Sequence, residues 1–97
     1  MTNFNQLVTH AVRLAILQVL EQDPDYSHNE HVLQTVLASL GHNLSSDRVR
    51  TEMRWLEEQE LVAVSEIGSL LIARITGRGV DVALGRSRID GIARPRP

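Results

Sequence analysis

Cysteine and lysine are both absent from this chain of 97 residues. Without cysteine, disulfides, thiolate chemistry and cysteine-ligated zinc are excluded. Aromatic residues are scarce, with one phenylalanine, one tyrosine and one tryptophan. The hydrophobic core must therefore be aliphatic, built from leucine, valine, isoleucine and alanine within a hydrophobic content of 42%.

Long apolar segments are missing as well. No run approaches the roughly 18 consecutive apolar residues of a membrane-spanning helix. The first residues, Met1 to Gln6, lack the positively charged segment that opens a secretory signal. We therefore expect a cytoplasmic protein with no membrane partner, and the chain length suits one domain with a modest core.

The residue patterns of common enzymes do not occur. There is no Gly-x-Ser-x-Gly sequence around a nucleophile, and no carboxylate pair accompanies a histidine at a recognisable spacing. His28 and His31 stand three residues apart, but zinc needs three or four ligands and nothing supplies the others. We expect neither an enzyme nor a metal or cofactor site.

Charge is distributed unevenly along the chain, whose formal net charge is −2. Residues 1–46 and 47–72 each carry −3, whereas residues 73–97 carry six arginines against two acids and reach +4. Arginine has a planar fork that binds guanine edges and phosphates, so the arginine-only composition suits DNA contact. A GC-rich coding sequence favours arginine equally well.

Hydrophobic periodicity predicts a mainly α fold with one small β-hairpin. Residues 1–85 form the expected domain, and the Arg/Pro-rich residues 86–97 form an extended C-terminal arm. The expected elements are a helix at 5–21, a second helix that begins with a capping box at Ser27–Glu30 and ends at Leu40, a third helix capped by Ser45 or Ser46, strands at 61–65 and 69–76, and a short fourth helix at 77–84 capped by Thr76.

The first helix is apolar on two sides. Val12 and Ile16 belong to one face, while Leu7, Leu14 and Leu17 form a second stripe. Because an ordinary surface helix needs only one apolar stripe, this helix is either central to the fold or packs against another chain. We expect a homodimer formed through this helix or through the terminal elements.

The third helix carries the residues that point to nucleic acid. Val49, Met53 and Leu56 are expected to face the core, which turns Arg50 and Arg54 outward. An arginine fork can bind a guanine edge, and a helix N-terminus can meet a phosphate. The candidate DNA-binding residues are Asn43, Ser45, Ser46, Arg48, Arg50, Thr51, Arg54, Arg86 and Arg88.

Acidic residues oppose this interpretation. Glu52 lies four residues after Arg48, and Glu57 and Glu58 follow Arg54 by three and four residues, so the arginines can equally form surface ion pairs. Trp55 is expected to stack on Arg48 or to cover the aliphatic core. The choice between DNA contact and a solvated helix face stays open at this point.

The run Leu56–Val62, the following hairpin and the segment Ile75–Ala83 resemble the winged helix-turn-helix regulators, in particular MarR-like and PadR-like proteins. This resemblance covers about Ser27 to Ala83. The tail Gly85–Pro95 resembles that of small winged-helix proteins carried by Mu-like phages and prophages. The resemblance implies a three-helix core with a β-hairpin wing and a short C-terminal helix, and it places the third helix in the major groove of double-stranded DNA.

We therefore expect a DNA-binding transcriptional regulator. The alternative is a phage-encoded winged-helix module that binds another protein without binding DNA. Glu66 favours this alternative, because it occupies the expected wing tip where DNA-contacting wings commonly present arginine or lysine. The net charge of −2 and the two-sided first helix favour it too.

Overall fold

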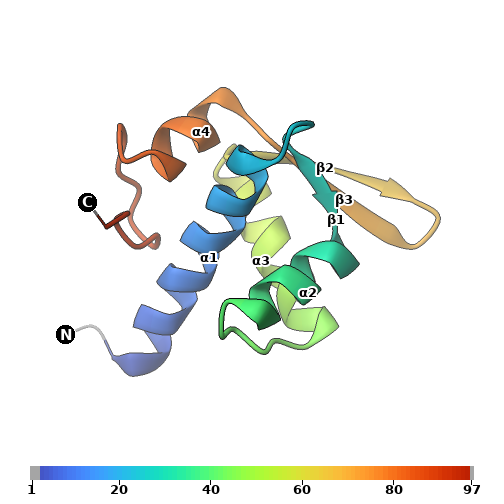
Figure 1. Cartoon of the computed structure of the whole chain (residues 1–97), viewed down its shortest axis with the longest axis horizontal. Helices are drawn as coiled ribbons and strands as arrows, with labels where there is room; N and C mark the ends of the chain where they lie inside the picture. The colour runs from blue at the N-terminus through green and yellow to red at the C-terminus, as the bar shows by residue number, and fades with distance from the viewer. Residues whose placement is uncertain (1–2, 97) are drawn as a thin grey trace.

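The computed structural model describes residues 3–96 and is mainly helical with a small antiparallel sheet, which agrees with the predicted fold class at that level (Figure 1). Within these residues the elements are α1 (Phe4–Gln22), β1 (Ser27–Asn29), α2 (Glu30–Ser39), α3 (Ser46–Glu58), β2 (Val62–Ile67), β3 (Leu70–Ile75) and α4 (Gly77–Ala83).

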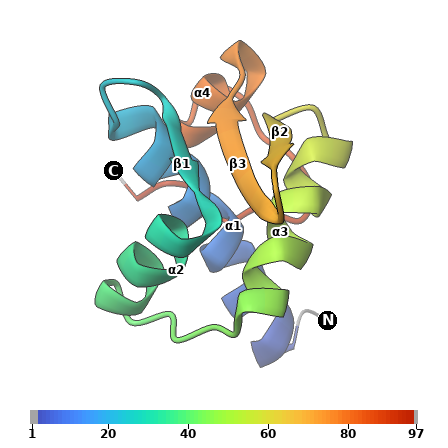
Figure 2. The same cartoon turned by 90° about the vertical axis from the view of Figure 1, so that its right-hand side faces the viewer.

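The sheet has three strands in the order β1-β3-β2, all antiparallel (Figure 2). β2 and β3 form the predicted hairpin, and Gly68 takes the positive φ of 61° that its turn requires. β1 was not predicted, because a strand of three residues is too short to show the alternation that identifies a strand.

The predicted capping box at Ser27 is wrong. Ser27 pairs with Arg74 in the ladder between β1 and β3, and α2 begins only at Glu30. The cap is Asn29, whose side chain accepts a hydrogen bond of 2.9 Å from the backbone N–H of Val32. The physical reason is the edge of β3, whose backbone groups need partners that the extended residues of β1 provide.

The other predicted caps are confirmed. The Ser45 hydroxyl accepts from the N–H of Arg48 at 3.1 Å and begins α3. The Thr76 hydroxyl accepts from the N–H of Gly79 at 3.1 Å and begins α4. Gly41, with φ of 95°, follows α2 in the left-handed conformation that favours glycine.

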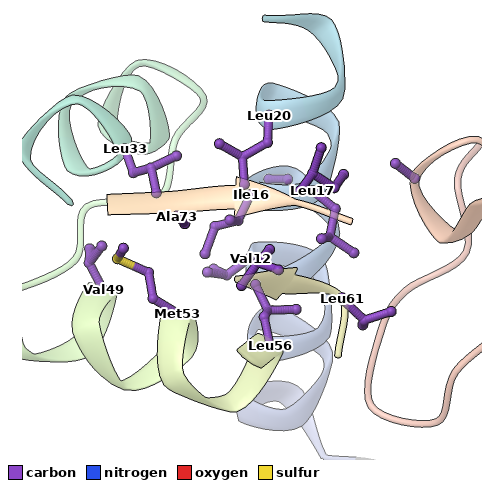
Figure 3. Close-up of a cluster of buried hydrophobic side chains, with 14 of the residues drawn as sticks. Val12, Ile16, Leu17, Leu20, Leu33, Val49, Met53, Leu56, Leu61 and Ala73 are labelled. Carbon is purple, nitrogen blue, oxygen red and sulfur yellow. The ribbon is translucent and has the colours of Figure 1, made fainter. Parts of the chain in front are cut away.

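The aliphatic core surrounds α1. Figure 3 shows side chains from α1, α2, α3 and β3 in one cluster with Val12 and Ile16 near its centre. Val49, Met53 and Leu56 are fully buried, which confirms the predicted inward face of α3. The second apolar stripe of α1 is divided: its later residues are buried, and α4 packs against α1, whereas Leu7 in the first turns stays exposed.

The C-terminal residues 86–96 pack against α1 (Figure 1). The N–H of Ala93 donates to the carbonyl of His10 at 3.1 Å, and Ile89 and Ile92 are half-buried against the core. Residues 89–93 of the expected extended arm therefore lie against the domain, since the two isoleucines hold them there. Between residues 3 and 96, no helix is both long enough and apolar enough to cross a bilayer.

Candidate nucleic-acid interface

The predicted site residues fall into two groups. Asn43, Ser45, Ser46, Thr51 and Arg54 are exposed at the start and along the outer side of α3, with Arg48 and Arg50 half-buried among them. Arg86 and Arg88 are exposed on the C-terminal segment, which lies on the far side of α1 from α2 in Figure 1. The structure thus brings the first group together and separates the other two residues from it.

The turn between α2 and α3 is held by one glutamine. Gln34 of α2 donates to the carbonyl of Leu44 at 2.9 Å, and its side-chain oxygen accepts from the Ser46 hydroxyl at 3.2 Å. With Ser45 bound to the first turn of α3, both serines take part in positioning that helix. The angle between α2 and α3 is therefore fixed by side chains as well as by the core.

A buried glutamate holds Arg48 against α1. Glu52 is only 3% exposed, and its two carboxylate oxygens accept from Arg48 Nε at 2.8 Å and from Arg13 Nε at 2.7 Å. Arg48 also donates to the Thr9 hydroxyl. Arg48 is thus occupied by contacts within the chain.

Arg13 connects three parts of the fold. Its guanidinium lies 3.7 Å from the centroid of the Trp55 ring, and Nη1 donates to the carbonyl of Gly91 at 3.1 Å. The expected stacking partner of Trp55 was Arg48, and Arg13 replaces it. The sequence could not indicate the contacts of Arg13, because its partner Glu52 is 39 positions away along the chain.

A second buried glutamate faces Arg50. Glu30 is 6% exposed, and its Oε2 accepts from the N–H of Leu71 at 2.6 Å. Arg50 Nε lies 3.1 Å from Glu30 Oε1, although it has no aligned hydrogen-bond acceptor within the described residues. Arg50 Nη2 donates to the carbonyl of Ser69 at 2.7 Å and lies 3.8 Å from Glu66. Arg50 therefore joins α3 to the hairpin.

Arg54 has the most exposed arrangement of the three α3 arginines. Its only carboxylate contact within residues 3–96 is Glu57, at 3.0 Å, and the two side chains are 47% and 37% exposed. Thr51 precedes it on the same face, and its hydroxyl donates to the carbonyl of Asp47 at 2.9 Å. An exposed ion pair of this kind contributes about 0.2–1 kcal/mol, so a stronger partner can replace it.

A groove of about 400 Å³ runs between α3 and the hairpin. Two arginines and two glutamates line it, together with a tryptophan and a leucine. The groove can therefore form hydrogen bonds and ion pairs with a ligand. Its lining residues are Arg50, Thr51, Arg54, Trp55, Glu58, Glu66 and Leu71.

Gly91→Ala is expected to lower the free energy of unfolding by about 1–3 kcal/mol beyond the cost of backbone strain. Gly91 has a φ of 96°, and a Cβ built there lies 2.9 Å from Trp55 Cζ2. Gly41→Ala is a matched control, because it has a φ of 95° with no described atom within 4 Å. Urea unfolding followed by Trp55 fluorescence measures both; equal losses would contradict the close contact.

Histidine and acidic residues do not gather into a metal site within the described part of the chain, where no group of three or more is placed to hold an ion. His28 instead contacts Asp23, with Nε2 at 2.7 Å from Oδ2. Asp23 directly follows α1, and His28 belongs to β1. The contact therefore joins the end of α1 to β1 across the connection between them.

Comparison with known proteins identifies relatives by sequence. No family model matches the chain, and no solved structure matches it. An uncharacterized protein of Haemophilus influenzae is 38% identical over 77 residues, 78% of this chain and 74% of that protein. The uncharacterized protein gp26 of Escherichia phage Mu is 44% identical over 93 residues, which cover 96% of each chain. At this identity and coverage, the chain belongs to the same family as gp26 of phage Mu.

Proposed function

We propose that this protein is a winged helix-turn-helix domain that binds double-stranded DNA through α3. The proposal rests on one observation: the outer face of α3, with Thr51 and Arg54, is exposed beside the hairpin of β2 and β3. The order of elements, with β3 between β1 and β2, supports the winged-helix assignment. In helix-turn-helix proteins the corresponding helix lies in the major groove.

The roles of the α3 residues differ in this proposal. Arg54 reads a base edge, since a bidentate contact with guanine discriminates by about 1–3 kcal/mol and outweighs its exposed pair with Glu57. Thr51 contacts a neighbouring base. Asn43 and the serines that begin α3 meet phosphates near the helix N-terminus.

Arg48 and Arg50 have a different part. Both are half-buried and contact the buried glutamates of this chain. We assign to them the positioning of α3 against α1 and against the hairpin. Removing them is expected to act through the placement of α3.

The biological setting belongs to the same proposal. The phage Mu relative supports a phage-encoded or prophage-encoded regulator of transcription. Phe4 and Leu7 are 77% and 56% exposed at the start of α1, which supports a homodimer through this helix. Such a dimer would present two α3 helices about 34 Å apart, the spacing of successive major grooves.

Arg54→Ala is expected to weaken binding to a selected DNA fragment about tenfold or more, because a base contact is lost. Fluorescence anisotropy at low salt, first with fragments of the host genome and then with the tightest of them, measures the effect. Arg74→Ala is the control: it removes another exposed arginine, from β3, and is expected to bind as wild type does. Equal binding by wild type and Arg54→Ala would contradict the proposal.

A second candidate function is binding of a basic protein partner. The observation that favours it is electrostatic: each arginine of α3 already contacts a carboxylate, and Glu66 and the exposed Ile67 lie near the tip of the hairpin. In the same titration, a folded wild type that binds no fragment at low salt supports this candidate and contradicts the first.

A further inference from the structure

The C-terminal segment encloses a hollow on the side of α1 where α4 packs. Its volume is about 520 Å³, within the range of small-ligand pockets. His10 of α1 and Val82 of α4 line it together with residues 87–95. The hollow is separate from the groove between α3 and the hairpin, because no residue lines both.

Two arginines are among the residues that line this hollow. Arg88 and Arg94 both line it, and neither has a carboxylate within 4.0 Å among residues 3–96. Asp90 lies on the same rim but forms no ion pair there. The contrast is with the arginines of α3, each of which contacts a glutamate. The guanidinium groups of the hollow are thus available to a ligand.

The rim of the hollow is anchored. Ala93 donates its N–H to the carbonyl of His10 at 3.1 Å, and the carbonyl of Gly91 accepts from Arg13 at 3.1 Å. Ile89 and Ile92 of the same segment also pack against the core. A ligand therefore meets a segment that is already ordered, so little conformational entropy is lost on binding.

We propose that this hollow binds a phosphate group through Arg88 and Arg94. The guanidinium fork matches phosphate oxygens in two parallel hydrogen bonds, and two such forks on one rim suit a dianionic or bridging phosphate. The source is either the backbone of a nucleic acid or a small phosphate compound. The inference goes beyond the proposed function, since it uses none of the residues of α3.

The test is a titration of the ¹⁵N-labelled full chain, followed by NMR, with pyrophosphate in one arm and a short DNA duplex of arbitrary sequence in the other. We expect saturable shifts of the amides of residues 86–94 and of His10. Shifts in both arms indicate a site for phosphate compounds generally, and shifts with the duplex alone indicate a backbone site. Either pattern supports the inference.

The variant R88Q/R94Q is expected to bind the responding probe about tenfold more weakly or worse, because each lost hydrogen bond involves two charged groups. R74Q loses one of the same charges on β3 and is expected to bind as wild type does. In the duplex arm, the binding constant K of the double variant also depends less on salt. The slope of log K against log salt becomes less steep by up to about 1.8.

Absence of shifts at residues 86–94 in both arms would overturn the inference, and so would undiminished shifts in R88Q/R94Q. Its failure is distinguishable from failure of the proposed function. Duplex shifts confined to α3, with no shift of the C-terminal segment in the pyrophosphate arm, contradict the phosphate site and support DNA binding by α3. Duplex shifts at the C-terminal segment without shifts on α3 support the phosphate site and contradict DNA binding by α3.

Discussion

Replacing Gly79 by alanine is expected to lower the free energy of unfolding by at least about 3 kcal/mol. Gly79 is buried in α4, and a Cβ built on it lies 2.1 Å from the carbonyl oxygen of Leu61 and 2.7 Å from Ile75 Cγ1. The oxygen belongs to the backbone and already accepts from the N–H of Thr76 at 3.0 Å. Because it cannot turn aside, α4 itself must move away.

Movement of α4 is costly because this helix covers α1. Val82 and Ala83 are buried on its inner side, and their exposure removes part of the apolar surface that stabilises the domain. A loss of about 3 kcal/mol corresponds to a decrease in Tm of roughly 12–24 °C for a domain of this size. Thermal and urea unfolding followed by circular dichroism measure both quantities.

Gly77→Ala is the matched control on the same helix. No described atom lies within 4 Å of a Cβ built at Gly77, and its φ is not in the left-handed region. We expect it to be neutral or to stabilise the protein by up to about 1 kcal/mol, since alanine restricts the unfolded chain. If the two variants unfold at the same urea concentration, α4 does not pack against Leu61 as described.

Replacing Glu52 by alanine is expected to lower the free energy of unfolding by about 3 kcal/mol. The carboxylate is buried and forms ion pairs with two guanidinium groups, those of Arg13 and Arg48. Without it, two cations face each other in a partly buried site. The value lies at the lower end of the range for breaking a buried pair, because the Arg48 side chain is 39% exposed and can turn toward water.

Glu58→Ala is the control for this prediction. Glu58 is exposed on the same helix and has no ion pair among residues 3–96, so its removal is expected to change stability by no more than about 0.5 kcal/mol. Trp55 fluorescence provides a second measurement, because Arg13 lies over the Trp55 ring and loses its carboxylate partner only in Glu52→Ala. An effect of Glu52→Ala as small as that of the control would show that the network contributes nothing.

The ion pairs of Glu52 with Arg13 and Arg48 also change which residues are candidates for ligand contact. From the sequence, Glu52 was expected to form a surface ion pair with Arg48. Its burial makes Arg48 a positioning residue and leaves Arg54 as the most accessible arginine of α3. The C-terminal arginines were expected in an extended arm, but two of them line an ordered hollow.

Features that depend on residues a few positions apart could be predicted from the sequence. The spacing of Val49, Met53 and Leu56 identified the inner face of α3, and Ser45 and Thr76 identified two helix starts. Each of these signals is complete within about two turns of helix. The isoleucines of the C-terminal segment were a further signal, since a fully solvated arm would leave both apolar side chains in water, whereas here they are half-buried.

Other features required the whole fold. β1 exists because β3, more than 40 positions later, presents an unpaired edge to Ser27–Asn29. Local preferences along the chain were enough to place the helices and the hairpin. Which arginines remain available to a ligand depends instead on the folded arrangement, because ion pairs such as Arg13–Glu52 join residues 39 positions apart and depend on burial that no local pattern encodes.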